Sequence, residues 1–318
     1  MEKIQLNRTD LKIAPIIFGG NVFSWTLDKN ASFDILDSYV DRGFNAIDTA
    51  NQYSYWVPGN RGGESEAILG SWMAQRGNRD KIILMTKVGG VYADNPRPNT
   101  TSAHILIEVE HSLRRLQTDY IDLYQTHFDQ VETPVEETLR AYEELIKQGK
   151  VRYIGASNLS PERLEASIQL SKQTELPMYK TLQPEYNLYS REGFEQGYQV
   201  LAERHELSVI PFYSLASGFL TGKYQNEADF SESPRSEGVK MKYWNDRGIK
   251  IISTVLDLAS QYDTTASAVS LAWLLAKPIV AAPIASATKK SHLESFSQAV
   301  ELALSPDDIG RLDEASRY

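Results

Sequence analysis

The chain has 318 residues, of which 42% are hydrophobic and 24% are charged, as is ordinary for a globular protein. Its formal net charge of −9 argues against nucleic-acid and anionic-membrane partners, because both bind a basic face. The absence of cysteine excludes disulfides and a thiol nucleophile. Neither a signal-peptide pattern nor a run of apolar residues long enough to span a membrane is present. We therefore expect a cytoplasmic protein.

Short apolar runs alternate with helical patterns along most of the chain. Before them, residues 3–13 (KIQLNRTDLKI) predict a hairpin that turns at Asn7 to Asp10. Eight runs then have the composition of buried strands, at residues 14–20, 44–48, 81–87, 121–127, 151–157, 180–186, 207–214 and 278–285. Helical spacing is found between them at residues 33–40, 64–75, 102–116, 135–148 and 161–172.

This alternation predicts parallel strands that are joined by helical crossovers. Eight such units predict an α/β fold of the (β/α)8 TIM-barrel type, with residues 1–318 as one domain. An open doubly wound sheet is the alternative, but no GxGxxG motif follows the first strand. The longest connections, 88–101 and 220–244, both follow strands, so we expect them to overhang the carboxyl-terminal mouth of the barrel.

Four polar side chains stand at predicted strand ends or just beyond them: Asp48, Tyr53, Lys87 and His127. Barrel enzymes carry their catalytic groups at this end of the strands. A phenol is a weak acid with a pKa of about 10, and a nearby ammonium such as Lys87 is expected to lower the pKa of Tyr53. Asp48 is the natural partner of a buried Lys87, and His127 can donate a hydrogen bond or relay a proton to Tyr53. Together the four predict a group that protonates a carbonyl oxygen.

Each of these residues has a structural explanation when it is taken alone. Asp48 can cap the following segment, Tyr53 can be a packing residue, Lys87 can be a solvated strand end, and His127 can be a core histidine. Singly, each of these is the commoner role. Their shared position at the strand ends favours the catalytic interpretation.

The strings FNAIDTANQY, DLYQTH, GASN and QPEYN, in this order, resemble the aldo-keto reductase superfamily. The resemblance extends from IFGG to the segment around Ser286 and is strongest toward bacterial NADP-dependent members, near the branch of the potassium-channel β-subunits. It implies a barrel whose base is closed by the N-terminal hairpin, and NAD(P)H-dependent interconversion of carbonyls and alcohols. It also implies that Tyr53 is the general acid in reduction and that Asp48, Lys87 and His127 complete the catalytic set.

The resemblance implies further residues for a bound cofactor. Three of them match the partners of the nicotinamide carboxamide, namely Ser157, Asn158 and Gln183, and Tyr213 matches the aromatic residue that stacks on the nicotinamide. The stretch YSLASGFLTGKY matches the loop around the pyrophosphate, with the expected contacts Ser214, Leu215, Ser217 and Lys223. The structural alternatives are a helix cap for Ser157 and Asn158, and core positions for Gln183 and Tyr213.

The segment IASATKKSHLESF departs from the usual family pattern. Ser286 stands where glycine is common, His292 where glutamine is common, and Phe296 where asparagine is common. Thr288, Lys289 and Lys290 stand at a predicted helix start, where the helix dipole disfavours cations unless an anion is bound. Because a 2′-phosphate is such an anion, we expect NADPH or NADP rather than NADH. A solvated helix start is the alternative.

An insertion after Tyr53, SYWVPGNRGGESE, adds aromatic residues near the predicted mouth. With neighbouring positions they predict a substrate wall formed by Trp25, Tyr55, Trp56 and Phe128, with Phe23 and Trp244 as further members. Such a wall suits a planar or apolar aldehyde or ketone, although the same residues can instead pack together to order a lid. We expect no metal site, and the sequence leaves the oligomeric state open.

The sequence favours an NADPH-dependent reductase of aldehydes or ketones, and three alternatives remain. The first is a dehydrogenase of a sugar, a polyol or a pyridoxine-like alcohol, which uses the same chemistry in reverse. The second is a non-catalytic regulatory subunit that binds nicotinamide nucleotides, as in the channel-associated branch. The third is an aldolase or isomerase with Lys87 as a Schiff base, against which the Asp48 partner argues, because a charged lysine is not a nucleophile.

Overall fold

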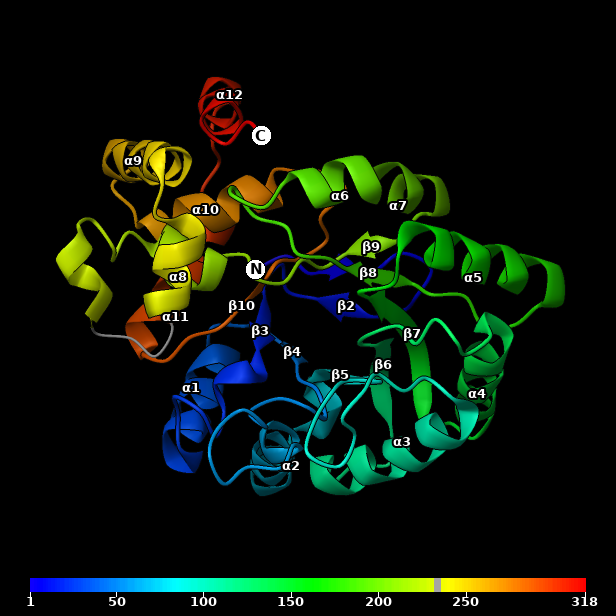
Figure 1. Cartoon of the computed structure of the whole chain (residues 1–318). Coiled ribbons are helices and arrows are strands. Elements are labelled where there is room, and N and C mark those ends of the chain that lie inside the picture. Colours follow the sequence, from blue (N-terminus) through cyan, green and yellow to red (C-terminus); the bar gives the residue numbers. More distant parts are fainter. Residues whose placement is uncertain (232–235) are drawn as a thin grey trace.

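The computed structural model describes residues 1–231 and 236–318. A short antiparallel hairpin comes first, with β1 (Ile4–Gln5) paired to β2 (Lys12–Ile13). Within the described residues, eight parallel strands then form one sheet (Figure 1). They are β3 (Ile17–Gly19), β4 (Ala46–Asp48), β5 (Ile83–Val88), β6 (Ile121–Thr126), β7 (Val151–Ser157), β8 (Thr181–Gln183), β9 (Ser208–Val209) and β10 (Ile284–Ala285).

The sheet is closed into a barrel. From β3 to β9 each strand pairs with the next in the chain, and β10 pairs with β3. Between β9 and β10 the backbone N–H of Ala281 donates to Val209 at 2.8 Å and that of Ile284 donates to Pro211 at 2.9 Å. The predicted (β/α)8 barrel is therefore confirmed, and the open doubly wound sheet is not the fold of this chain.

Helices surround the strands (Figure 1). They are α1 (Lys29–Asp41), α2 (Glu64–Arg76), α3 (Ser102–Leu116), α4 (Val135–Lys147), α5 (Pro161–Thr174), α6 (Glu192–Gly197), α7 (Gln199–His205), α8 (Ser236–Tyr243), α9 (Asp246–Gln261), α10 (Ala266–Leu275), α11 (Lys290–Glu301) and α12 (Pro306–Ala315). The described residues also contain the short 3-10 segments η1 (Gly20–Val22), η2 (Arg79–Lys81), η3 (Ala216–Thr221) and η4 (Glu227–Ser231). Among the described residues, no helix has the length and apolar character that a membrane span requires.

The hairpin closes the base of the barrel, as expected. Its buried side chains join inward-facing residues from the first halves of the strands in one apolar cluster, which includes Leu6, Leu11, Ile13, Ala46, Met85 and Leu123. Side chains of a strand alternate between its two faces, so the residues two positions further along also face inward. On β4, β5 and β6 these are Asp48, Lys87 and Gln125, and all three are buried. The interior thus changes from apolar at the base to polar at the mouth.

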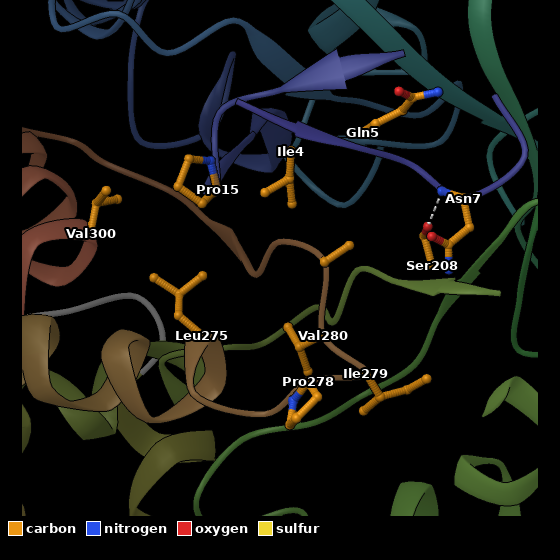
Figure 2. Close-up of a pocket in the computed structure, with 11 residues that line it drawn as sticks. Ile4, Gln5, Asn7, Pro15, Ser208, Leu275, Pro278, Ile279, Val280 and Val300 are labelled. Atoms are coloured by element: carbon orange, nitrogen blue, oxygen red, sulfur yellow. Dashed lines mark hydrogen bonds between the residues drawn. The ribbon is translucent and has the colours of Figure 1, made fainter. Parts of the chain in front are cut away.

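A cavity of about 370 Å³ lies on the hairpin side of the barrel (Figure 2). Gln5 of β1 and Val280 line it, and nearby the backbone N–H of Asn7 donates to Ser208 Oγ at 2.8 Å. Its lining residues share no member with the predicted site residues, all of which lie in the described part of the chain.

Strands β3, β4, β8, β9 and β10 are shorter than the sequence predicts, and for the last three, prolines at their ends explain the difference. Pro184 follows β8, Pro211 lies two residues after β9, and Pro283 precedes β10. A proline has no N–H to donate to the ladder, so regular pairing stops there. Isolated bonds continue beyond, because Phe212 N–H donates to Pro184 at 2.9 Å.

The two long connections also have partial structure of their own. Tyr92 and Asn95 form an isolated antiparallel bridge within 88–101. In the other connection, η4 and α8 are helical, so that segment is more regular than the predicted loop. The part of this predicted loop at residues 232–235 lies outside the described residues.

Candidate active site

The structure brings Asp48, Lys87 and Tyr53 into direct contact. Asp48 ends β4 and Lys87 lies near the end of β5, while Tyr53 lies in the turn after β4. Lys87 Nζ donates to Asp48 Oδ2 at 2.5 Å, to the Thr49 carbonyl at 2.9 Å and to Tyr53 Oη at 2.7 Å. The Tyr53 hydroxyl also lies 3.3 Å from Asp48 Oδ2. Lys87 is fully buried, and its ammonium has three acceptors. A buried ammonium requires such partners for its N–H groups.

The electrostatic effect on Tyr53 is the reverse of the expected one. Burial raises the pKa of Tyr53 well above its usual value, and the Asp48 carboxylate raises this pKa further. Burial also lowers the pKa of Lys87, although Asp48 favours its charged form. The expectation that Lys87 makes the phenol more acidic omitted the depth of the site and the second charge beside the phenol. Tyr53 is thus held as the neutral, proton-bearing phenol.

His127 lies beside Tyr53, directly after β6. Its ring centre is 5.9 Å from that of Tyr53 and 4.7 Å from that of Phe128. Burial lowers the pKa of His127 well below its usual value, and the charge of Lys87 lowers this pKa further, so the imidazole is neutral. Gly90 faces its Nδ1, and a Cβ at Gly90 would overlap the side-chain amide of Gln52. A glycine at position 90 therefore makes room for both His127 and Gln52.

Asp48 is held from its other side by two amides. Gln125 Nε2 donates to Asp48 Oδ1 at 3.0 Å, and Gln183 Nε2 donates to the same oxygen at 3.1 Å. The two amides are also 3.1 Å apart, from Gln183 Nε2 to Gln125 Oε1. With Lys87 on Oδ2, both carboxylate oxygens have donors, which fixes the orientation of Asp48.

A cavity of about 1270 Å³ opens above these residues. Tyr53 and His127 line it, whereas Asp48 and Lys87 lie buried beneath its floor. Apart from Lys290, which does not line it, the predicted cofactor residues all do: Ser157, Asn158, Gln183, Tyr213, Ser214, Leu215, Ser217, Lys223, Ser286, Thr288, Lys289 and His292. Residues that are far apart in the sequence thus share one cavity with Tyr53.

The part of the cavity beside His127 is polar. Asn158 Nδ2 donates to the His127 carbonyl at 2.8 Å and to Ser157 Oγ at 3.0 Å. The Ser157 hydroxyl in turn donates to the Gln183 carbonyl at 2.9 Å. In their side-chain hydrogen bonds, Asn158 and Gln183 use their nitrogens as donors, and both residues line the cavity. Their side-chain oxygens remain as possible acceptors for a ligand.

The segment after β9 has an unusual backbone. Tyr213, Ala216 and Ser217 adopt the left-handed region, with φ of 53°, 48° and 55°. Non-glycine residues rarely do so, and such strain is concentrated at functional sites. The buried Asn187 donates from Nδ2 to the Tyr213 carbonyl at 3.0 Å, which stabilises this geometry. The ring of Tyr213 remains exposed over the cavity.

The far end of the cavity is cationic and lies at the start of α11. Lys289 is the N-cap residue of α11, and its side chain makes no capping bond. Thr288 N–H donates to His292 Nδ1 at 3.3 Å. Partial burial lowers the pKa of His292, and the charges of Lys289 and Lys223, which line the same cavity, lower it further. Ser286 Oγ lies 2.7 Å from both the Gly19 carbonyl and Asn21 Oδ1, so it joins the end of β10 to that of β3.

The four predicted aromatic wall residues divide into two pairs. Trp56 and Phe128 line the cavity, and the Trp56 ring centre is 6.5 Å from that of Tyr53. Trp25 and Tyr55 are not among the lining residues; they contact Trp56 edge-on, with ring centres 5.4 and 5.8 Å away. Trp25 and Tyr55 therefore lie behind Trp56 and support it.

Several residues of this site were not selected from the sequence. Gln125 had a usable signal, because alternation along β6 places it inward two positions after Leu123. Gln52 stands next to Tyr53, and Asn187 ends the quoted string QPEYN, but their contacts depend on loop geometry. Glu185 lies in the same string; it lines the cavity and accepts a bond from Lys242 at 2.7 Å, a contact between residues far apart in the sequence. The described residues contain no group of three or more metal-binding side chains.

Comparison with known proteins gives the same family as the fold and the site. The sequence model of the Aldo/keto reductase family matches residues 15–317. Aldo-keto reductase YhdN of Bacillus subtilis is 32% identical, over 91% of this chain and 84% of the relative. Norsolorinic acid reductase of Aspergillus flavus is 29% identical, over 99% and 81%. A probable voltage-gated potassium channel subunit beta of Arabidopsis thaliana is 29% identical, over 95% and 92%.

This chain belongs to the aldo/keto reductase family. The resemblance found in the sequence is confirmed, including its bacterial and channel-subunit relatives. Membership assigns the protein to the oxidoreductases that act on carbonyl compounds, a family that uses nicotinamide cofactors.

Proposed function

We propose that this protein reduces an aldehyde or a ketone to the alcohol with NADPH, and that Tyr53 donates the proton. The main support is the position of the Tyr53 hydroxyl at the floor of the large cavity, 2.7 Å from Lys87 Nζ. A proton donor with a cation behind it is what a carbonyl oxygen needs as negative charge develops on it.

Each residue has a distinct part in this chemistry. Bound NADPH supplies a hydride to the carbonyl carbon. Tyr53 gives its phenolic proton to the carbonyl oxygen, and the ammonium of Lys87 stabilises the phenolate that remains. Asp48 keeps Lys87 charged and fixed, and the neutral His127 offers a hydrogen bond to the same substrate oxygen.

The residues along the cavity fit a dinucleotide. Ser157, Asn158 and Gln183 offer amide and hydroxyl groups for the nicotinamide carboxamide, and the exposed ring of Tyr213 offers a stacking face. Ser217, in the left-handed segment after β9, lines the cavity and offers its hydroxyl to a pyrophosphate. Ser214, Leu215 and Lys223 border the same part of the cavity.

Two observations favour NADPH over NADH. Lys289 and Lys223 both line the cavity, and the first N–H groups of α11 have no side-chain cap from Lys289. A phosphate group satisfies both the cations and the helix N-terminus. Thr288, Lys289 and His292 are therefore the proposed contacts of the 2′-phosphate, with Ser286 at the adjoining wall.

Trp56 and Phe128 are the proposed substrate contacts. They border the cavity beside Tyr53 and His127, and Trp25 and Tyr55 hold Trp56 from behind. Aromatic faces at this point favour planar or apolar carbonyl compounds. We also propose that residues 1–318 form one domain and that the protein acts in the cytoplasm.

The alternatives fit the site less well. Alcohol oxidation, as in a sugar, polyol or pyridoxine-like dehydrogenase, uses the same residues in reverse, and the aromatic lining by Trp56 and Phe128 favours planar or apolar compounds over a sugar or polyol. A Schiff base at Lys87 needs a free amine, whereas Lys87 Nζ donates to three acceptors. A purely regulatory subunit would not need the proton-donating set at the cavity floor.

The reaction class is tested by label transfer. Enzyme is incubated with an aromatic aldehyde and NADPH that carries deuterium at the transferred position of the nicotinamide. We expect the product alcohol to carry one deuterium on its carbinol carbon, measured by mass spectrometry. An unlabelled alcohol, or no turnover across a panel of aldehydes and ketones, would contradict the proposal.

A further inference from the structure

A buried ionic network lies outside the barrel, between helices α2 and α3. Glu66 of α2 is fully buried and Glu108 of α3 is 5% exposed. Arg115 of α3 joins them, with Nε 2.7 Å from Glu66 Oε2 and Nη2 3.9 Å from Glu108 Oε2. Burying two carboxylates with one shared guanidinium is costly, and apolar packing at such a place is often more stable. We therefore expect the network to have a role besides stabilising the fold.

Each carboxylate also holds an element of the candidate active site. Glu108 Oε2 accepts from Asn51 Nδ2 at 2.9 Å, and Asn51 lies in the turn that connects β4 to Tyr53. Glu66 Oε1 accepts from Thr86 Oγ1 at 2.6 Å, and Thr86 precedes Lys87 on β5. The two ends of the network thus lie two residues from Tyr53 and one residue from Lys87.

The tie between Asn51 and Glu108 has no substitute in the surrounding structure. Among the described residues, the Asn51 side chain has this one hydrogen bond, and its Oδ1 is buried without a partner. Glu108 is itself held by His111, whose Nδ1 lies 2.8 Å from Glu108 Oε1, and by a hydrogen bond with the Tyr92 side chain. The acceptor is therefore fixed from α3 and from the connection that precedes it, and it anchors the turn from outside the barrel.

The packing of α2 on α3 allows the network to form. A Cβ at Gly70 of α2 would overlap the carbonyl oxygen of Arg115, so only glycine permits this approach. The first turn of α2 is also fixed to the site, because Ser65 Oγ lies 2.7 Å from Thr49 Oγ1 and donates to the Gly20 carbonyl at 2.8 Å. The Thr49 carbonyl in turn accepts a bond from Lys87.

We propose that Asn51 and Glu108 are positioning residues, which hold the turn 49–53 so that the Tyr53 hydroxyl stays on Lys87. This inference rests on the proposed function of Tyr53. A displacement of the reacting group by about 1 Å can reduce turnover by about 100-fold, so an anchor two residues away matters for rate. Asn51 and Glu108 do not line the cavity, so neither contacts a bound cofactor directly, and we expect cofactor binding to survive their substitution.

Substitutions at Asn51 and Glu108 test the role of their hydrogen bond. For Asn51→Ala and for Glu108→Ala we expect kcat to fall by about 10- to 100-fold, while the Kd for NADPH stays at the wild-type value. The double variant is expected to match Glu108→Ala, because Asn51→Ala removes a link that Glu108→Ala has already removed. Glu108→Gln keeps an acceptor for Asn51 but loses the charge opposite Arg115, so it should lose stability yet keep kcat.

Asn45→Ala is the matched control. Asn45 is a buried asparagine at the opposite end of the β4 segment, where it accepts from Ala14 N–H at 2.8 Å and donates to the Lys12 carbonyl at 3.0 Å. It should lose stability and keep kcat. The inference would be overturned by a wild-type kcat in folded Asn51→Ala, or by losses of kcat that multiply in the double variant. If Asn51→Ala does not fold, an equal kcat in Glu108→Ala and Glu108→Gln would overturn it.

Tyr53→Phe is measured alongside to separate the two proposals. If Tyr53→Phe is inactive and Asn51→Ala is fully active, the positioning role is wrong and the proposed function stands. If Tyr53→Phe retains wild-type turnover, the proposed function is wrong and the positioning role falls with it.

Discussion

At the scale of the residue, Lys289 is the most informative position for cofactor choice. It lines the cavity at the uncapped start of α11, and its neighbour Lys290 does not line the cavity. For Lys289→Ala we expect the Kd for NADPH to rise roughly tenfold or more, because a charge-assisted hydrogen bond contributes about 1.5–3 kcal/mol. The Kd for NADH should not change, and Lys290→Ala serves as the matched control. Titration of intrinsic fluorescence measures both constants, and equal wild-type affinity for the two cofactors would contradict a phosphate site.

At the scale of the element, the sequence predicted best where alternation and helical spacing were long. β5, β6 and β7 and the helices that follow them lie within a few residues of their predicted bounds. The ends of β8, β9 and β10 were not predicted, because prolines interrupt the pairing while the chain continues in nearly the same direction. Regular structure between residues 220 and 244 was also missed, since its helical segments are short.

The candidate site shows the same division between local and long-range information. The meeting of Asp48, Lys87 and Tyr53 followed from strand ends that converge in a barrel. The amides of Gln125 and Gln183 on Asp48 depend on the register between neighbouring strands, and the support of Tyr213 by Asn187 depends on the path of a loop. The direction of the Tyr53 pKa shift depended on depth, which only the packed structure reveals.

At the scale of the whole molecule, the buried neutral His127 predicts a loss of stability in mild acid. Burial lowers the pKa of His127 well below its usual value in the folded chain, whereas in the unfolded chain this ring takes up a proton below about pH 6.5. Protonation therefore favours the unfolded state as the pH falls, by up to roughly 1.4 kcal/mol per pH unit. We expect the urea midpoint to fall between about pH 7 and about pH 5.5. A midpoint that is constant or higher in acid would contradict neutral burial of this ring.

The most direct test of the account is the substitution Tyr53→Phe, because it removes one hydroxyl from the cavity floor and leaves the ring. Turnover of a reactive aldehyde is followed by NADPH oxidation, and NADPH binding is followed by fluorescence titration in the same preparation. General acid catalysis typically contributes about 100- to 10,000-fold, so we expect kcat to fall by at least that lower factor while the Kd for NADPH stays within about threefold of wild type. Retention of wild-type kcat by a variant that folds and binds NADPH would contradict the assignment of Tyr53 as the proton donor.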